Sequence, residues 1–517
     1  MLAEIYKGSG DRTNPANSRA VLVEDTAAKV YHAWLRRRLM PYYLAKAHSS
    51  VYGGVPQRGT DMCSHQSMAF WEYTRSTGKS AAQIFVDILG AFDAVVRQLV
   101  LGSSELPFDD EAIARIVASL GLPPEVMHHL AKELSRMSVL EQAEVPLPLR
   151  RPVAEAHAHT WFSTQGLASV VEPRAGSRPG DPLGDIIFNF LEGHVHGKLA
   201  DQLHGHPAIL HLPPLPARLS PSFLDNEPAE VFFNNYVDDD AFCLAADNAY
   251  DLLMHVYSAF AIIVRTFFRL GLVLNFKENK TECILSLVGS RSRDILHDLI
   301  TNKKATITIP AAKVGIGGSD FDLRVVAWYK HMGICSAPTR GLSLKAKARS
   351  GAMFTTYRSI RNRVIHNKYL EIETKLSLCS SFLFSRLFYG AALWHNEPPH
   401  ARTTIANAYV TPIRESLGLR NVDDKGKLLP KESRTTNAQV FVAAQLPTAV
   451  GKARVMRVRY WCRLVCAAPH TLMRLALACH DVKGTWSHDL ALDLAVCWAT
   501  AAAPFDKLLD SRLEPLP

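Results

Sequence analysis

Three consecutive aspartates, Asp238 to Asp240, lie between two apolar segments of the sequence. Val231-Phe232-Phe233 precedes them and the run from Ala241 to Ala246 follows them. Two apolar runs joined by a short polar tip predict a β-hairpin. Two carboxylates 4 Å apart repel each other by about 4 kcal/mol at an effective dielectric constant near 20, so a tip held against a core needs a compensating charge. A solvated turn would tolerate the repulsion, whereas a packed tip predicts a divalent cation such as Mg²⁺.

A second acidic residue, Asp87, ends the apolar run Ile84-Phe85-Val86. We expect a short strand from Gln83 to Ile88, so this carboxylate also terminates a buried strand. Only the fold can bring it to the hairpin tip. Two acidic strand ends that meet are what a two-metal enzyme uses to hold an attacking 3′-hydroxyl and a leaving pyrophosphate. Either acid alone is weak evidence for that chemistry.

Helical spacing of apolar residues recurs along the rest of the chain. It predicts helices at Ala27–Tyr43, Phe92–Leu101, Asp110–Leu120, Pro124–Met137, Pro182–Leu199 and Ala249–Leu270, and a mostly helical segment from Leu342 to Trp394. Gly205 to Pro228 is rich in Pro and His, which indicates a surface insertion. The fold class expected is α+β, with a small sheet that carries the acids and helices around it.

Positive charge is concentrated in one part of the chain. The net charge is +9, and the 47 residues from Arg340 to Arg386 hold ten Lys and Arg against Glu371 and Glu373, a local balance of 10 − 2 = +8. Basic helices of this kind favour a polyanionic partner such as nucleic acid. A solvated charged helix face would have the same composition.

The cysteines and the ends of the chain bear on the compartment. Nine cysteines without paired spacing indicate a reducing environment. Cys462, Cys466 and His470 are the nearest approach to a zinc pattern, but they fall in a predicted helix and we interpret the thiols as buried and structural. The N-terminus does not resemble a signal peptide, and the apolar stretch Phe382–Trp394 is too short to span a bilayer. We therefore expect a soluble intracellular protein, nuclear or cytoplasmic, with no membrane partner.

Several segments resemble a known family when taken together and in order. Tyr236-Val237-Asp238-Asp239 resembles the YxDD box of reverse transcriptases, and Val86-Asp87 through Asp93 resembles their first aspartate motif. Four more segments are similar to boxes of the non-LTR (LINE-type) retrotransposon enzymes: Arg174–Leu183, Gly271–Asn275 with Lys280-Thr281, Tyr329–Gly333, and Phe388-Tyr389-Gly390 with Trp394. The resemblance covers roughly residues 1–400. The ordered set is specific, whereas each box alone is weak.

The resemblance implies a right-hand polymerase fold. It implies N-terminal fingers at 1–80, a palm at 81–337 with a fingers segment at about 95–175 and a surface insertion at about 203–229, a helical basic thumb at 338–397, and a mainly helical C-terminal region at 398–517. The implied activity is RNA-directed DNA polymerisation with two Mg²⁺ ions, for which Mn²⁺ could substitute. The implied partners are an RNA template, a DNA primer and dNTPs. No endonuclease precedes the fingers, so we expect any such activity on another chain.

The resemblance also implies a role for individual residues. Asp87, Asp238 and Asp239 would hold the metal ions, and Lys280 would protonate or neutralise the leaving pyrophosphate. The residues expected to bind the nucleotide are Lys7, Arg19, Phe92, Gly180 and Asp181, with the Phe92 ring excluding a 2′-hydroxyl. Those expected to bind template or primer are Arg178, Met332, Gly333, Arg358, Arg361 and Arg363.

The sequence also departs from the family pattern and leaves two alternatives open. Pro179 stands where the family commonly has Gln, and Gly184-Asp185 replaces the usual Ser-Pro. An RNA-dependent RNA polymerase shares the palm chemistry, although Phe92 and the YxDD tip argue against it. A decayed or co-opted palm that binds nucleic acid without copying it is the other alternative, against which the intact aspartates argue.

Overall fold

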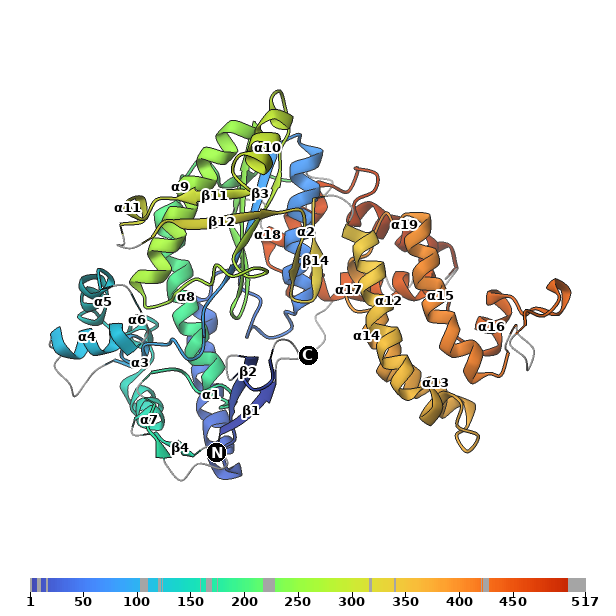
Figure 1. The fold of residues 1–517 in the computed structure, drawn as a ribbon, viewed down its shortest axis with the longest axis horizontal. Helices are drawn as coiled ribbons and strands as arrows, with labels where there is room; N and C mark the ends of the chain where they lie inside the picture. The colour runs from blue at the N-terminus through green and yellow to red at the C-terminus, as the bar shows by residue number, and fades with distance from the viewer. Residues whose placement is uncertain are drawn as a thin grey trace.

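The structure of the 517-residue chain is a computed structural model. It describes residues 2–6, 11–14, 17–102, 110–119, 122, 124–158, 160–163, 170–173, 175–216, 228–315, 319–338, 341–419, 421 and 427–500. The chain forms a mixed α+β fold, in which the sheet and its helices lie on one side and most of the helices after residue 340 gather on the other (Figure 1). The α+β class expected from the sequence is therefore confirmed.

A six-stranded sheet with the order β11-β12-β10-β3-β9-β8 organises the first part of the chain. Its strands are β11 (Thr306–Ile309), β12 (Phe321–Val326), β10 (Glu282–Ser286), β3 (Ser80–Asp87), β9 (Asp239–Ala246) and β8 (Phe233–Tyr236). All neighbours pair antiparallel except β10 and β12, which are parallel. The predicted hairpin is β8–β9, and the strand predicted at Gln83–Ile88 is the end of β3.

Smaller paired strands lie around this sheet. They are β1 (Leu2–Tyr6) with β2 (Ser18–Leu22), β4 (Phe162–Ser163) with β5 (Val170–Val171), β6 (Leu210–Leu212) with β7 (Ala229–Val231), and β13 (Tyr329–His331) with β14 (Ile334–Ser336). The helices that precede β12, the last strand of this sheet along the chain, are α1 (Thr26–Lys46), α2 (Thr60–Ser76), α3 (Arg97–Leu101), α4 (Asp110–Ser119), α5 (Val126–Leu134), α6 (Val139–Gln142), α7 (Leu147–His157), α8 (Gly184–Leu203), α9 (Ala249–Arg269), α10 (Ser292–Thr301) and α11 (Ala311–Val314).

The central strands are buried on both faces because apolar residues occupy both sides of the pleat. Side chains at 82, 84 and 86 of β3 and at 242, 244 and 246 of β9 enter the core formed with α8 and α9. Those at 81 and 85 of β3 and at 241, 243 and 245 of β9 enter a second core with α2. Successive side chains on a strand point to opposite faces. The same alternation decides which way each aspartate at the strand ends points.

Helix α9 is long and apolar enough, by length and composition, to cross a membrane, and it alone meets that test among the described residues. Within its most apolar window, 56% is buried inside the protein. Asn248 caps its start by accepting the Asp251 N–H at 3.0 Å, and Gly271, at a φ of 82°, follows its end. Such burial is typical of a core helix in a soluble protein.

The remaining helices follow the sheet along the chain, and most of them form the other side of the molecule. They are α12 (Gly341–Ile360), the π-helix η3 (Arg361–Ile365), α13 (Ile372–Cys379), the π-helix η4 (Ser380–Phe384), α14 (Ser385–Leu387), α15 (Pro399–Ser416), α16 (Asn437–Ala443), α17 (Ala449–Ala467), α18 (His470–Ala478) and α19 (Trp486–Thr500). Short 3₁₀ turns lie at Ala391–Leu393 and Lys431–Ser433. Residues between 346 and 453 share one core, so the chain crosses the predicted boundary at 397/398 within a single packed unit.

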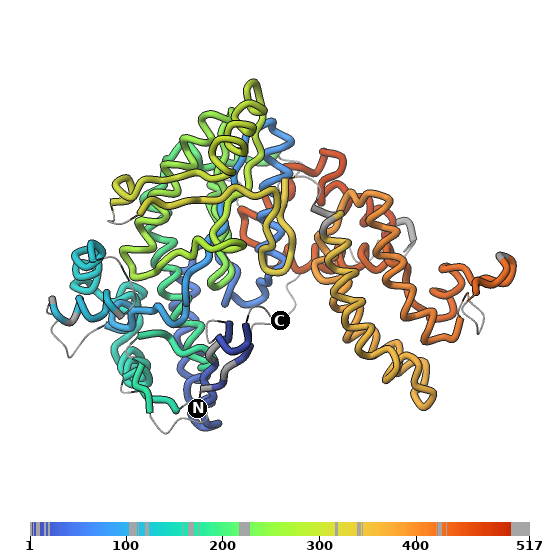
Figure 2. Tube along the Cα trace, viewed as in Figure 1, coloured from blue at the N-terminus to red at the C-terminus, as the bar shows by residue number. Residues whose placement is uncertain are grey.

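The C-terminal helices return to the sheet side of the molecule. Figure 2 traces this part of the chain, in orange and red, back toward the blue α2. The Tyr460 hydroxyl of α17 lies 3.1 Å from His65 Nδ1 of α2, and the Trp486 N–H donates to Glu72 at 3.1 Å. Arg474 of α18 donates to the Pro213 carbonyl at 2.6 Å. These helices therefore cover α2 and the β6–β7 pair.

Three expectations about local structure are corrected. The helix predicted at Phe92–Leu101 begins only at Arg97, because the Asp93 and Ala94 N–H groups both turn back to the Gly90 carbonyl. The insertion predicted at Gly205–Pro228 is not wholly superficial: residues 208–210 and 212 are buried, β6 lies within it, and residues 217–227 lie outside the described residues. Cys462 and Cys466 are exposed on α17 rather than buried.

Candidate active site

The strand register brings the predicted catalytic carboxylates together. Asp87 at the end of β3 is the direct partner of Asp239 at the start of β9. Directly opposed residues of an antiparallel pair have Cα atoms about 4.5–5.5 Å apart. Both side chains belong to the α2 face of the sheet, and Asp238 precedes Asp239 at the exposed tip. The register therefore places the backbone of Asp87 opposite that of Asp239, with Asp238 next to it in the chain.

Asp87 is held in place by the segment that follows α9. Asn275 donates its side-chain N–H to Asp87 Oδ2 at 2.9 Å and its backbone N–H to the Asp87 carbonyl at 2.8 Å. Lys280 Nζ donates to Asp87 Oδ1 at 2.9 Å, and the Asp87 N–H donates to the Thr281 hydroxyl at 3.2 Å. The segment predicted from Gly271 to Thr281 therefore orients the first carboxylate. Asn275 was present in that motif but was not predicted as a site residue.

The electrostatics of the site are dominated by burial and by like charge. Burial, and after it the charges of Asp238, Asp87 and Asp240, raise the pKa of Asp239 to about 7, while Lys280 opposes the rise. Among the described residues, Lys280 is the cation paired with Asp87. The donor set fits Mg²⁺, which binds through a few carboxylates and completes its shell with water or phosphate oxygens.

The hairpin tip is strained and is braced from outside. Val237 has a φ of 60°, which is rare for a β-branched residue and costs roughly 1–3 kcal/mol. Asn235 Nδ2 donates to the Val237 carbonyl at 2.6 Å, and Tyr52 N–H donates to the Asn235 carbonyl at 2.9 Å. A Cβ added to Gly53 would lie 2.3 Å from Val237 N. The loop before α2 therefore fixes the tip by close backbone contact.

The segments predicted to bind the nucleotide also meet. The Ser177 N–H donates to the Phe92 carbonyl at 2.7 Å, and the Phe92 ring lies 4.9 Å from that of Phe188 on α8. Gly180 has a φ of 99°, and a Cβ there would lie 2.6 Å from the Leu22 carbonyl oxygen. Its close backbone approach is thus to β2.

Of the remaining predicted nucleotide-binding residues, the structure describes the side chain of Asp181 but not those of Arg19 and Lys7. The Asp181 side chain is fully buried, with His32 Nδ1 at 3.0 Å and Arg178 at 2.6 Å. It accepts a hydrogen bond from the Leu183 N–H at 2.8 Å, so this buried carboxylate stabilises the backbone just before α8. Arg19 lies in β2 without a described side chain, and Lys7 lies outside the described residues.

The predicted template and primer residues divide into two groups. Met332 and Gly333 form the turn between β13 and β14, where Tyr389 donates its hydroxyl to the Met332 carbonyl at 2.9 Å. Arg349 donates to the Gly333 carbonyl and lies 4.5 Å from the Tyr389 ring centre. Two segments singled out separately in the sequence, at 329–333 and 388–390, are therefore in contact.

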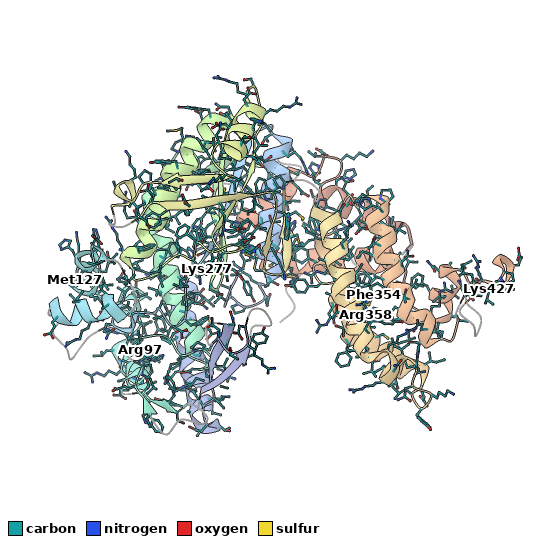
Figure 3. The ribbon with its side chains drawn as sticks, in the orientation of Figure 1. Arg97, Met127, Lys277, Phe354, Arg358 and Lys427 are labelled. Atoms are coloured by element: carbon teal, nitrogen blue, oxygen red, sulfur yellow. The ribbon has the colours of Figure 1, made fainter. Side chains whose placement is uncertain are left out.

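The other group lies at the end of α12 and in η3. Arg358, labelled in Figure 3, and Arg363 are exposed. Arg361 instead makes a bidentate pair with Glu415 of α15, at 2.9 and 3.0 Å. Its guanidinium joins two helices, so removing it would disturb packing as well as charge.

Comparison with known proteins adds no assignment: no protein-family model matches the chain, and no curated protein matches it significantly.

Proposed function

We propose that this chain is an RNA-directed DNA polymerase, a reverse transcriptase similar to those of non-LTR retrotransposons. The observation that carries the proposal is the pairing of Asp87 with Asp239 beside Asp238, with Lys280 bound to Asp87. Two carboxylate-bearing strand ends in direct register form the kind of ligand set used in two-metal nucleotidyl transfer. The order of the remaining motifs along the chain supports the same conclusion.

Each residue of the site has a distinct task in this proposal. Asp87, Asp238 and Asp239 would hold two Mg²⁺ ions, which supply charge neutralisation for the attacking 3′-hydroxyl and the leaving pyrophosphate. Lys280 keeps a positive charge next to Asp87 and can donate a proton toward the leaving group. Asn275 and Thr281 fix the orientation of Asp87 through three hydrogen bonds of 2.8–3.2 Å.

Selection of the sugar and grip on the duplex fall to other residues. Phe92, packed on Phe188, has a ring available to exclude a 2′-hydroxyl and thereby favour dNTPs. Arg358 and Arg363 would contact phosphates of the primer–template duplex without reading its sequence. The turn at Met332-Gly333 would position the primer end, held by Tyr389 and Arg349.

Primer extension tests the proposal. The purified chain is given an RNA template, a DNA primer, Mg²⁺ and either dNTPs or NTPs, with Asp238→Asn as the matched variant. We expect extension with dNTPs by the wild type and none by Asp238→Asn. Extension only with NTPs would favour an RNA polymerase. Duplex binding without extension by either protein would favour a nucleic-acid-binding palm.

A further inference from the structure

Behind the hairpin tip, α8 and β9 bring three buried side chains together. Glu192, His196 and Asp240 each offer one ligand atom, and these atoms all lie within 4.8 Å of one another. His196 Nε2 is 2.8 Å from Asp240 Oδ1 and 3.5 Å from Glu192 Oε2. The side chains of His196 and Asp240 are fully buried, and that of Glu192 is 2% exposed. The group lies on the sheet face opposite to Asp87 and Asp239.

The local structure explains why these residues converge. Glu192 and His196 are four residues apart on α8, so they share one face of the helix. Asp240 follows Asp239 on β9, so it points to the other side of the pleat, toward the core that contains α8. The His196 ring stacks on Phe233 with centroids 4.4 Å apart, which fixes the direction of Nε2.

No lysine or arginine among the ion pairs of the described residues is paired with this group. Within the described ranges, His196 is the ion-pair partner of both carboxylates, and Asn235 Nδ2 donates to Asp240 Oδ1 at 3.0 Å. Both Glu192 oxygens, Asp240 Oδ2 and His196 Nδ1 have no hydrogen-bond partner in the described part of the chain. Burial, and after it the charges of Asp240 and Asp238, raise the pKa of Glu192 well above its ordinary value. Two buried carboxyl groups with so few donors must therefore either hold a proton or be compensated by a cation.

A second group of the same composition provides a contrast. Glu24, His32 and Asp181 also bring three ligand atoms within 4.8 Å of one another. There, however, Arg178 lies 2.6 Å from Asp181 Oδ2 and supplies a cation from the protein. The group at Glu192 has no such arginine among the ion pairs of the described residues.

We propose that Glu192, His196 and Asp240 bind one divalent transition-metal ion, Zn²⁺ or Mn²⁺, as a structural centre distinct from the site at Asp87 and Asp239. One imidazole nitrogen with two carboxylates suits these ions, whereas Mg²⁺ prefers oxygen ligands and retained water. Ligand atoms about 2.1 Å from a shared tetrahedral ion lie about 3.4 Å apart, close to the 3.5 Å between His196 Nε2 and Glu192 Oε2. The 2.8 Å between His196 Nε2 and Asp240 Oδ1 is a hydrogen bond that the bound ion would replace. The ion would join α8 to the hairpin. The inference does not depend on the proposed polymerase activity.

Metal binding by the full chain tests this inference. The protein is stripped with a chelator, titrated with Zn²⁺ or Mn²⁺, and its retained metal is measured by mass spectrometry after dialysis. The variants are Glu192→Gln and His196→Gln, with His32→Gln as the control from the second group and Asp87→Asn as the control for the other site. We expect one tightly held equivalent in the wild type and both controls, and affinity at least about tenfold weaker in the two variants.

Two results would overturn the inference: no tightly held equivalent in the wild type, or equal retention by His196→Gln. If the variants do not fold, pulsed electron paramagnetic resonance of Mn²⁺ bound to the wild type still decides the question. The inference expects coupling to an imidazole nitrogen, which a site made only of carboxylates does not give. Failure of the polymerase proposal would instead appear as absent primer extension with metal retention unchanged.

Discussion

Asp239 and Asp240 are adjacent in the sequence but belong to opposite faces of the sheet. Asp239 pairs with Asp87 on the α2 face, whereas Asp240 bonds to His196 on the α8 face. The sequence predicted that the aspartates need compensation, and it predicted the partner Asp87 from its place at a strand end. It did not predict that Asp239 and Asp240 point to opposite faces of the sheet, because that depends on the exact register of β3 and β9. The Glu-x3-His spacing at 192–196 was a readable signal within the predicted helix 182–199 that sequence reasoning missed.

The raised pKa of Asp239 predicts how stability depends on pH in the metal-free protein. The folded protein keeps this proton up to a pH of about 7, whereas the unfolded chain releases it near 3.8, so stability falls as pH rises between these values. Asp239→Asn removes the effect. We expect the melting temperature of the variant, relative to wild type, to be higher at pH 8 than at pH 5 by about 2 °C or more.

The matched control is Asp247→Asn, because Asp247 is exposed just after β9 and its pKa is lowered by Lys79. Its difference from wild type should not grow with pH. Thermal unfolding in chelator at the two pH values is the measurement. A melting difference for Asp239→Asn that is the same at both pH values would contradict the electrostatic account.

Lys280 carries a second prediction at the residue scale. Lys280→Gln should lower the single-turnover rate of nucleotide addition by about 10²-fold or more, because the group next to Asp87 loses its proton and charge. Lys277→Gln is the control, since Lys277 is exposed in the same loop (Figure 3). Rapid-quench kinetics would measure both. Equal rates for the two variants would mean that Lys280 has no part in the chemistry.

At the scale of elements, the hairpin depends on the loop that precedes α2. Sequence patterns predicted β3, β8–β9, α1, α8 and α9 because apolar periodicity and capping residues mark them. They did not predict that Gly53 lies against Val237, since that contact joins segments far apart in the chain. The helix predicted to begin at Phe92 begins at Arg97 instead, because Gly90 forms a turn that interrupts the helical pattern.

Gly53→Ala should therefore destabilise the protein. The new methyl group would lie 2.3 Å from Val237 N, a backbone atom that cannot move without the tip. We expect a loss of about 1–3 kcal/mol in unfolding free energy. The control, Gly351→Ala, lies in open space on α12 and should be neutral or stabilising by about 0.5–1 kcal/mol. Chemical denaturation measures both, and equal stability of the two variants would exclude the contact.

For the whole molecule, the C-terminal helices are the part that sequence reasoning could least place. The sequence predicted a helix around Cys462, Cys466 and His470 within a mainly helical C-terminal region, but it did not indicate which part of the protein that helix packs against. In the structure, Tyr460, Leu464, Leu472 and Trp486 share a core with Tyr52 and Met62. Which surface the C-terminal helices pack against depends on the complementary shape of the two surfaces and on the burial of Glu72 and His65 on α2. A single sequence does not reveal either feature.

The distribution of charge over the whole molecule predicts how binding responds to salt. Arg358→Gln with Arg363→Gln should reduce the slope of log affinity against log salt by about 1.5, because two phosphate contacts are lost. Arg361 is left intact because it pairs with Glu415. Arg293→Gln, exposed on α10, is the control. Duplex binding measured at several salt concentrations would reject the role if the double variant matched the control.

The claim on which the proposed function depends is that Asp87 and the hairpin tip share a cation. Fe²⁺ can replace Mg²⁺ at such sites, and with ascorbate and peroxide it generates radicals that cut the nearest backbone. Mapping the cuts in the His196→Gln chain, in which the other proposed metal site beside Asp240 is disabled, tests the claim directly. We predict cuts beside both Asp87 and Asp238 in this chain, and the loss of both when Asp87→Asn is added. Cuts at the hairpin that persist unchanged after Asp87→Asn is added would contradict a shared metal site.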